Sequence, residues 1–224
     1  MTKRMGPDRA YLAPASFIDS DDPRLSQWAR GIVDGIEGEI ARARALYLAV
    51  RDRVLYDPYL DFGQPDTFRA SRVLASGKGF CVGKAALLAA CARAVGIPAR
   101  VGYADVKNHM TSPRLREFLQ TDVFIWHSYA ELFLEGQWVK ATPAFNIDLC
   151  AKAGVAPLDF DGRSDSLFQP YSADGRRHME YLKDRGTFAD VPFETILSDL
   201  RAYYPRMMGA KPLEGSFASE VERT

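Results

Sequence analysis

Two side chains in this sequence, the thiol of Cys81 and the imidazole of His127, are of the types that together carry out nucleophilic catalysis. The thiolate is the reactive form of cysteine. A thiol beside an imidazole can form an ion pair that attacks carbonyl carbon near neutral pH, and the imidazolium then protonates the leaving group. Whether the two residues can act together depends on the elements that hold them.

Cys81 is predicted to stand at the start of a helix. It follows the segment Gly77-Lys78-Gly79-Phe80 and precedes a run of helix formers that stops at Gly96. The predicted helix, Val82 to Val95, has one buried stripe at helical spacing, made of Leu87, Leu88, Cys91 and Val95. The free N–H groups and the positive dipole end at a helix start favour a thiolate. A lone cysteine is more often a buried structural thiol, so the reactive interpretation depends on the histidine.

His127 lies in a predicted strand, Asp122 to Leu134, in which side chains alternate between two faces. One face is polar and aromatic and carries His127, Tyr129, Glu131 and Phe133. The other face is the expected core face, with Trp126, Ser128, Ala130, Leu132 and Leu134. The pattern therefore places His127 where it could meet the start of a helix.

A second strand, Trp138 to Thr142, follows a tight turn. If Glu135-Gly136 is a two-residue turn, Tyr129 pairs with Thr142, and His127 pairs with Ala144. Thr142 then lies diagonal to His127 at about 7 to 8 Å between backbones, within reach of a side-chain hydrogen bond. A change of one residue in the loop would turn Thr142 to the opposite face.

Composition limits the classes of partner. Lysine and arginine number 29, as do aspartate and glutamate, so no net field attracts nucleic acid or an anionic membrane. Three cysteines at irregular spacing do not make a disulfide framework, and three histidines argue against a histidine-rich metal site. The first twenty residues have no apolar core of signal-peptide length, and no stretch anywhere has the length of a membrane span. We therefore expect a cytoplasmic protein without metal or cofactor.

The rest of the chain predicts elements around this pair. They are a helix over Glu39 to Val54, a helical turn over 69–76, a strand over Ala99 to Val106, a short helix around Leu115 to Leu119 and a last helix over Val191 to Tyr204. Residues from Pro205 onward are expected to form a partly disordered tail. His109 and His178 have no partner at readable spacing and are expected on loops or on the surface.

Three separated segments resemble the bacterial transglutaminase-like superfamily. They are Gly79-Phe80-Cys81, then Ala92 to Arg100, then His127 with Glu131, followed by Trp138 and Pro143. The resemblance covers about 43–145. It implies an α+β fold with a papain-like core, in which a nucleophile helix packs on an antiparallel sheet. It also implies one domain over 1–224, with a core of about 39–146, an N-terminal extension and a C-terminal extension over 147–224.

In that family Cys81 corresponds to the nucleophile and His127 to the general base and acid. The family's third member is an aspartate before the proline, where this sequence has Thr142. A threonine hydroxyl can accept a hydrogen bond from the imidazole but brings no negative charge. Asn146 has matching strand parity and is an alternative orienter, and Asp148 is a weaker one. For the second oxyanion donor, besides the N–H of Cys81, the sequence leaves three side chains open: Gln64, Trp126 and Tyr129.

Two classes of function remain open. The first is a cysteine enzyme that acts on the amide bond of a peptide or other amide through an acyl-thioester on Cys81, as a peptidase, an amidase or an acyl transferase. The second is a transglutaminase-like binding module that has lost turnover, because Thr142 replaces the acid. The sequence does not indicate the substrate, the oligomeric state or the role of 147–224.

Overall fold

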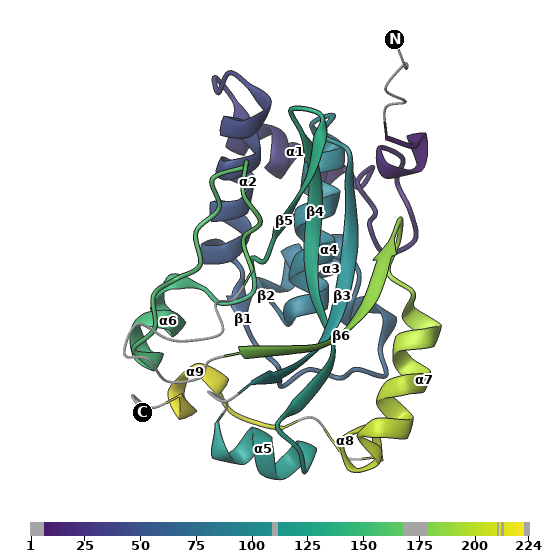
Figure 1. Cartoon of the computed structure of the whole chain (residues 1–224), viewed down its shortest axis with the longest axis vertical. Coiled ribbons are helices and arrows are strands. Elements are labelled where there is room, and N and C mark those ends of the chain that lie inside the picture. The colour runs from purple at the N-terminus through teal and green to yellow at the C-terminus, as the bar shows by residue number, and fades with distance from the viewer. Residues whose placement is uncertain (1–6, 109–111, 168–178, 210, 212, 222–224) are drawn as a thin grey trace.

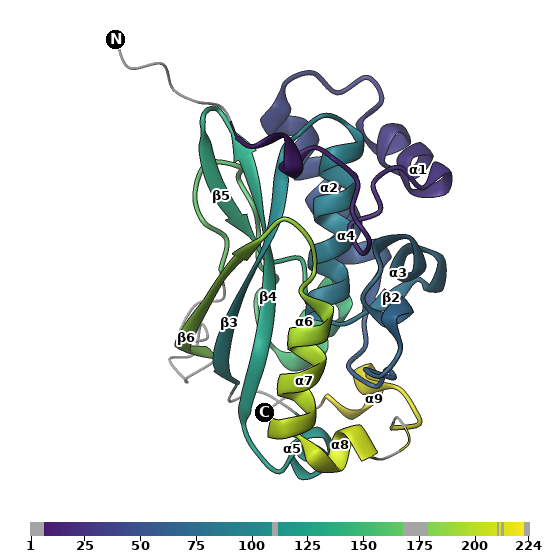
Figure 2. The ribbon, with the colours of Figure 1, turned by 90° about the vertical axis from the view of Figure 1, so that its right-hand side faces the viewer.

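The computed structural model describes residues 7–108, 112–167, 179–209, 211 and 213–221. Its framework is an antiparallel sheet with the strand order β5-β4-β3-β6. The strands are β3 (Ala99–Asn108), β4 (Val123–Leu134), β5 (Gln137–Ala141) and β6 (Met179–Phe188). Figures 1 and 2 show the sheet on one side of the molecule and the helices α1 to α4 stacked on its other side. An α+β fold with a helix on an antiparallel sheet was predicted and is confirmed.

Helix α4 (Cys81–Ala94) is the element against which both layers pack. Every residue from Cys81 to Arg93 is buried. One side of the helix lies on β3 and β4, and the other sides are covered by α1 (Pro23–Val33), α2 (Glu39–Arg53) and α3 (Ala70–Ser76). Alanines on the helix surface allow this close approach from several directions, and burial of Leu87 and Leu88 contributes about 1.5 to 3 kcal/mol each. The helix start is therefore held rigidly.

Glycines shape the entry into α4. Gly77 ends α3 with a φ of 68°, a left-handed conformation that favours glycine. The next residues form β2 (Lys78–Gly79), which pairs in parallel with β1 (Leu55–Tyr56). In the first turn of α4, a Cβ on Gly83 would lie 2.8 Å from a Val73 methyl and 2.9 Å from the Thr67 carbonyl oxygen. The sequence thus needs glycine for both a turn and a close contact here.

The turn after β4 has the predicted register. Leu134 pairs with Gln137 around Glu135-Gly136, and the ladder continues to Ala130 opposite Ala141. Strand β5 ends there, so the pairing predicted for Thr142 and Ala144 is not formed. The regular alternation of β4 is also interrupted, because a bulge lies where Ala104 pairs with His127 but Val106 pairs with Phe124.

The C-terminal part surrounds one end of the sheet. It contains α6 (Ile147–Ala153), β6, α7 (Phe193–Tyr203), α8 (Pro205–Gly209) and α9 (Phe217–Glu220). The connection before β4 forms α5 (Pro113–Leu119), and short 3-10 helices occur at Arg9–Tyr11 and Pro65–Thr67. Figure 2 shows α7 running along the sheet edge toward α5 and α8. The predicted tail from Pro205 is thus partly helical, whereas His109 and His178 lie outside the described residues.

Among the described residues, no helix combines the length and the apolar character needed to cross a membrane.

Candidate active site

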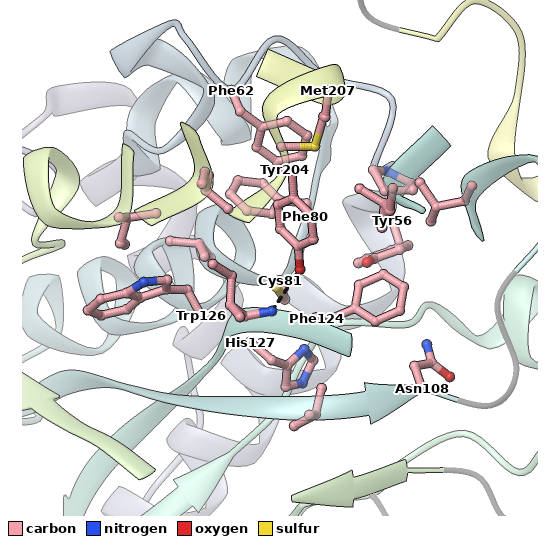
Figure 3. Close-up of a pocket in the computed structure, with 18 of the residues that line it drawn as sticks. Tyr56, Phe62, Phe80, Cys81, Asn108, Phe124, Trp126, His127, Tyr204 and Met207 are labelled. Carbon is pink, nitrogen blue, oxygen red and sulfur yellow. Dashed lines mark hydrogen bonds between the residues drawn. The ribbon is translucent and has the colours of Figure 1, made fainter. Parts of the chain in front are cut away.

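Cys81 and His127 line the same cavity, which has a volume of about 780 Å³ including space open to solvent. Cys81 is the first residue of α4, and His127 lies in the middle of β4. Figure 3 shows Cys81 near the centre of this cavity, with His127 on one side and Phe62, Tyr204 and Met207 on the other. The structure therefore brings the two predicted reactive residues to one site.

The Cys81 thiol is largely shielded from water, with 9% of the residue exposed. Burial raises the pKa of Cys81 to about 11, whereas the backbone N–H groups of Ser128, Val82 and Cys81 itself act in the opposite direction. The predicted help from the helix start is present, but desolvation outweighs it. Burial therefore favours the protonated thiol, and a base that takes its proton would assist attack by the sulfur. Ser128 directly follows His127, so the backbone that carries the imidazole adjoins the sulfur.

Strand β4 has an unusual backbone conformation at Trp126, the residue before His127. Trp126 has a φ of 58°, which is costly for a bulky residue. Its N–H donates to Asp105 Oδ1 at 3.1 Å, and its indole Nε1–H donates to Asp199 Oδ2 at 2.9 Å. Arg185 joins both carboxylates, at 2.5 Å to Asp105 and 2.7 Å to Asp199, and its guanidinium lies 4.6 Å from the indole centroid. This network fixes the path of β4 immediately before His127.

Within the described residues, no hydrogen bond joins His127 to Thr142 or Asn146, the two main candidates for the orienting residue. Thr142 Oγ1 is buried and forms no hydrogen bond within the part of the chain that the structure describes, while its carbonyl oxygen accepts the Tyr47 hydroxyl at 3.1 Å. Asn146 Oδ1 accepts the Tyr56 N–H at 3.1 Å, which ties the chain after β5 to β1. Neither residue lines the cavity. Asp148 is exposed on α6.

Of the three predicted oxyanion donors, only Trp126 lines the cavity. Its indole N–H is already bonded to Asp199. Gln64 is exposed, and Tyr129 packs over Gly102, where a Cβ would lie 2.3 Å from the ring. The backbone N–H groups of Cys81 and Ser128, which act on the sulfur, are the donors that the site itself supplies.

The sequence did not indicate how many distant segments complete the cavity. Asn108, at the end of β3, contributes a polar side chain to it. The C-terminal part contributes Ile196 and Leu200 from α7, Tyr204, and Met207 from α8. A helical pattern in 191–204 was the one available signal, and it could not say what that helix covers. Within the described residues, no group of three or more His, Cys, Asp or Glu could hold a metal ion.

Comparison with known families agrees with this geometry. The sequence model of the transglutaminase-like superfamily matches residues 26–143, more than half of the chain, including both Cys81 and His127. The chain belongs to the transglutaminase-like superfamily. A comparison with curated proteins finds no match.

Solved structures similar to this transglutaminase-like chain include bacterial and animal proteins. The "putative cysteine protease" of Cytophaga hutchinsonii has a TM-score of 0.48 and 20% identity, over 80% of this chain and 46% of that protein. Red sea bream transglutaminase has a TM-score of 0.42 and 16% identity, over 78% of this chain and 40% of that protein. The chain thus spans less than half the length of these two structures.

Proposed function

We propose that the protein is a cysteine enzyme that cleaves or transfers an acyl group through a thioester on Cys81. The observation that carries this proposal is the position of Cys81 and His127 on the wall of one cavity. The start of a rigid, wholly buried helix holds the thiol, and a strand fixed by a charged network holds the imidazole. Superfamily membership supports the same roles for the two residues.

In the proposed reaction His127 acts as the base that takes the proton of the Cys81 thiol, whose pKa is raised by burial. The thiol proton passes to the imidazole as sulfur bonds to the carbonyl carbon of an amide. The carbon–nitrogen bond then breaks, and the imidazolium gives its proton to the leaving amine. Water or a second amine attacks the thioester, forms the product and returns the thiol. The backbone N–H groups of Cys81 and Ser128, which act on the sulfur, are the proposed donors to the oxyanion.

We also propose that the whole chain, 1–224, is one domain with its core at about 39–146. Support comes from the cavity itself, because α7 and α8 of the extension contribute to the same walls as α4 and β4. Removal of the extension would open the site to water.

A binding module without turnover is the second candidate. Two observations favour it: the raised pKa of Cys81, and the absence of a hydrogen bond at Thr142 Oγ1 among the described residues. Such a protein would keep the cavity as a ligand site.

An acyl-trapping experiment separates the two functions. The protein is mixed with p-nitrophenyl acetate, and the covalent acetyl adduct is located by mass spectrometry of the intact chain and its peptides. We expect an adduct on Cys81 that disappears in Cys81→Ala and persists in Cys150→Ala, since Cys150 is also buried but lies away from the cavity. Water and an added primary amine then compete for the acyl group. The absence of an adduct on Cys81 would contradict the enzyme and favour the binding module.

A further inference from the structure

The cavity beside Cys81 is lined mostly by apolar side chains. Among its described lining residues there is no aspartate, glutamate, lysine or arginine. Its walls are instead aromatic and aliphatic, with Phe62, Phe80, Leu115, Phe118 and Met207 among them. A charged group placed among these apolar side chains would lose its water, which costs far more free energy than burying an apolar group.

Several polar groups of the wall are already engaged within the protein. The Tyr204 hydroxyl accepts the Ile125 N–H at 2.9 Å and donates to the Val123 carbonyl at 2.8 Å. The Trp126 indole N–H donates to Asp199. These contacts hold β4 in place and leave the aromatic faces to the cavity. The lining therefore combines the reactive groups of Cys81 and His127 and the polar side chain of Asn108 with a large apolar surface, as Figure 3 shows.

A neighbouring cavity provides a contrast. It shares Phe62, Phe118 and Met207 with the first cavity but also contains Asp61 and Arg201. Asp61 and Arg201 thus lie close by, but neither is among the described residues that line the cavity of the thiol. The two neighbouring cavities thus differ in polarity, and the cavity that contains Cys81 is the more apolar of the two.

We propose that the acyl group transferred to Cys81 is neutral and apolar, with an aliphatic or aromatic portion seated among the side chains of the cavity. This inference deepens the proposed function and rests on it for the covalent step. In that step sulfur bonds to the carbonyl carbon, the leaving group departs with the electron pair, and the thiol proton goes to His127. The apolar portion positions the carbonyl carbon without reacting.

The test compares acylation of Cys81 by three p-nitrophenyl esters: the acetate, the hexanoate, and the adipate monoester, which has the hexanoate's length and a terminal carboxylate. The rate measured with Cys81→Ala is subtracted from each wild-type rate. The result is divided by the rate at which the same ester acylates N-acetylcysteine, which removes differences in the intrinsic reactivity of the esters. Burial of a methylene is worth about fourfold, so the four extra methylenes of the hexanoate give at most about 200-fold. We expect a corrected preference of about tenfold or more for hexanoate over both other esters. A smaller preference contradicts the proposal.

Two neighbouring methionines supply a matched pair of variants. Met207 lines the apolar cavity, whereas Met208 lines only the neighbouring one, and both are half-buried. Met207→Glu places a carboxylate at the apolar wall and should reduce the preference for hexanoate at least fivefold. Met208→Glu should leave it within twofold of the original. Equal effects of the two variants would contradict the assignment of this cavity.

Failure of the proposed function has a different signature. If none of the esters acylates Cys81, the covalent chemistry is wrong, and binding alone tests the cavity. Hexanamide, acetamide and adipic acid monoamide are then titrated into Cys81→Ala and followed by NMR. Saturable binding of hexanamide at least tenfold tighter than that of the other two, and weakened by Met207→Glu, supports a neutral apolar ligand. Equal affinities contradict it.

Discussion

Lys84 predicts an unusual dependence of stability on pH. Its side chain is completely buried on α4, three residues after Cys81. The ammonium donates to the carbonyl oxygens of Arg51 and Val54 at 2.9 and 2.5 Å, and so satisfies acceptors at the end of α2. Burial lowers the pKa of Lys84 from 10.5 to about 7, and the charge of Asp52 opposes this only in part. The folded protein thus releases this proton at a lower pH than the unfolded chain.

The sign and size of this pH dependence follow from the difference in proton binding between the folded and unfolded states. Between about pH 7 and about pH 10.5 the unfolded state holds the Lys84 proton and the folded state does not, so the free energy of unfolding rises with pH. With a folded pKa of about 7, the gain from pH 7 to about pH 8.5 is about 1.6 kcal/mol. Below pH 7 the contribution flattens. Above about pH 9 the buried thiols Cys81, Cys91 and Cys150 act oppositely, because burial raises their pKa and only the unfolded state loses their protons.

Urea denaturation at these two pH values, under reducing conditions, measures this gain. The comparison is with Lys84→Met, which keeps the length of the side chain but cannot titrate, and with Lys78→Met, which removes an exposed lysine paired with Asp57. We expect wild type and Lys78→Met to gain about 1.6 kcal/mol more than Lys84→Met over this interval. Equal pH dependence in all three proteins would refute the reasoning about Lys84.

The remaining predictions concern the elements that hold the site. Asp105→Ala should destabilise the protein by about 2 to 4 kcal/mol in urea, because it leaves the Trp126 N–H and the half-buried Arg185 guanidinium without a shared acceptor. Lys107→Ala, which removes an exposed ion pair from the same strand, should cost less than about 1 kcal/mol, and equal losses would contradict the role of the network. Gly83→Ala should cost about 1 to 3 kcal/mol through overpacking, whereas Gly31→Ala on α1 should stabilise by about 0.5 to 1 kcal/mol, since its Cβ meets nothing within 4 Å. Thermal denaturation of the two glycine variants checks this difference in sign.

Local patterns predicted the parts of the site that depend on local physics. The glycines, helix formers and stop at Gly96 located the helix of Cys81 within a residue. Turn chemistry at Glu135-Gly136 gave the register of β4 and β5 as far as Ala141. Each of these elements follows from a short stretch of sequence. For that reason the cysteine and histidine could be placed without knowledge of the rest of the fold.

Three features could not be predicted, because each depends on contacts between distant segments. Alternation in β4 fails at Trp126, where the bulge is stabilised by Asp105 and by Arg185 from β6. Strand β6 itself pairs with β3 across a large separation in sequence. The pKa of Cys81 is governed by burial under several elements rather than by the helix start alone. The helix start alone therefore does not set the pKa of this thiol.

The orienting residue is the least predictable part of the site. Thr142 lies just beyond Ala141, the last paired residue of β5. Because the strand ends before Thr142, the alternation of side chains along a strand no longer places Thr142 on the same face as His127. The side-chain oxygen Oδ1 of Asn146 accepts the Tyr56 N–H. Side-chain partners of this kind are decided by tertiary packing, not by periodicity.

The most direct test of the central claim is the rate at which p-nitrophenyl acetate acylates Cys81 in wild type and in His127→Gln, measured from about pH 6 to about pH 11. If His127 is the base, the variant reacts about 100-fold or more slowly near pH 7.5. The two rates then converge near pH 11, where Cys81 loses its proton without help. Equal rates of wild type and His127→Gln near pH 7.5 would contradict the proposed catalytic pair.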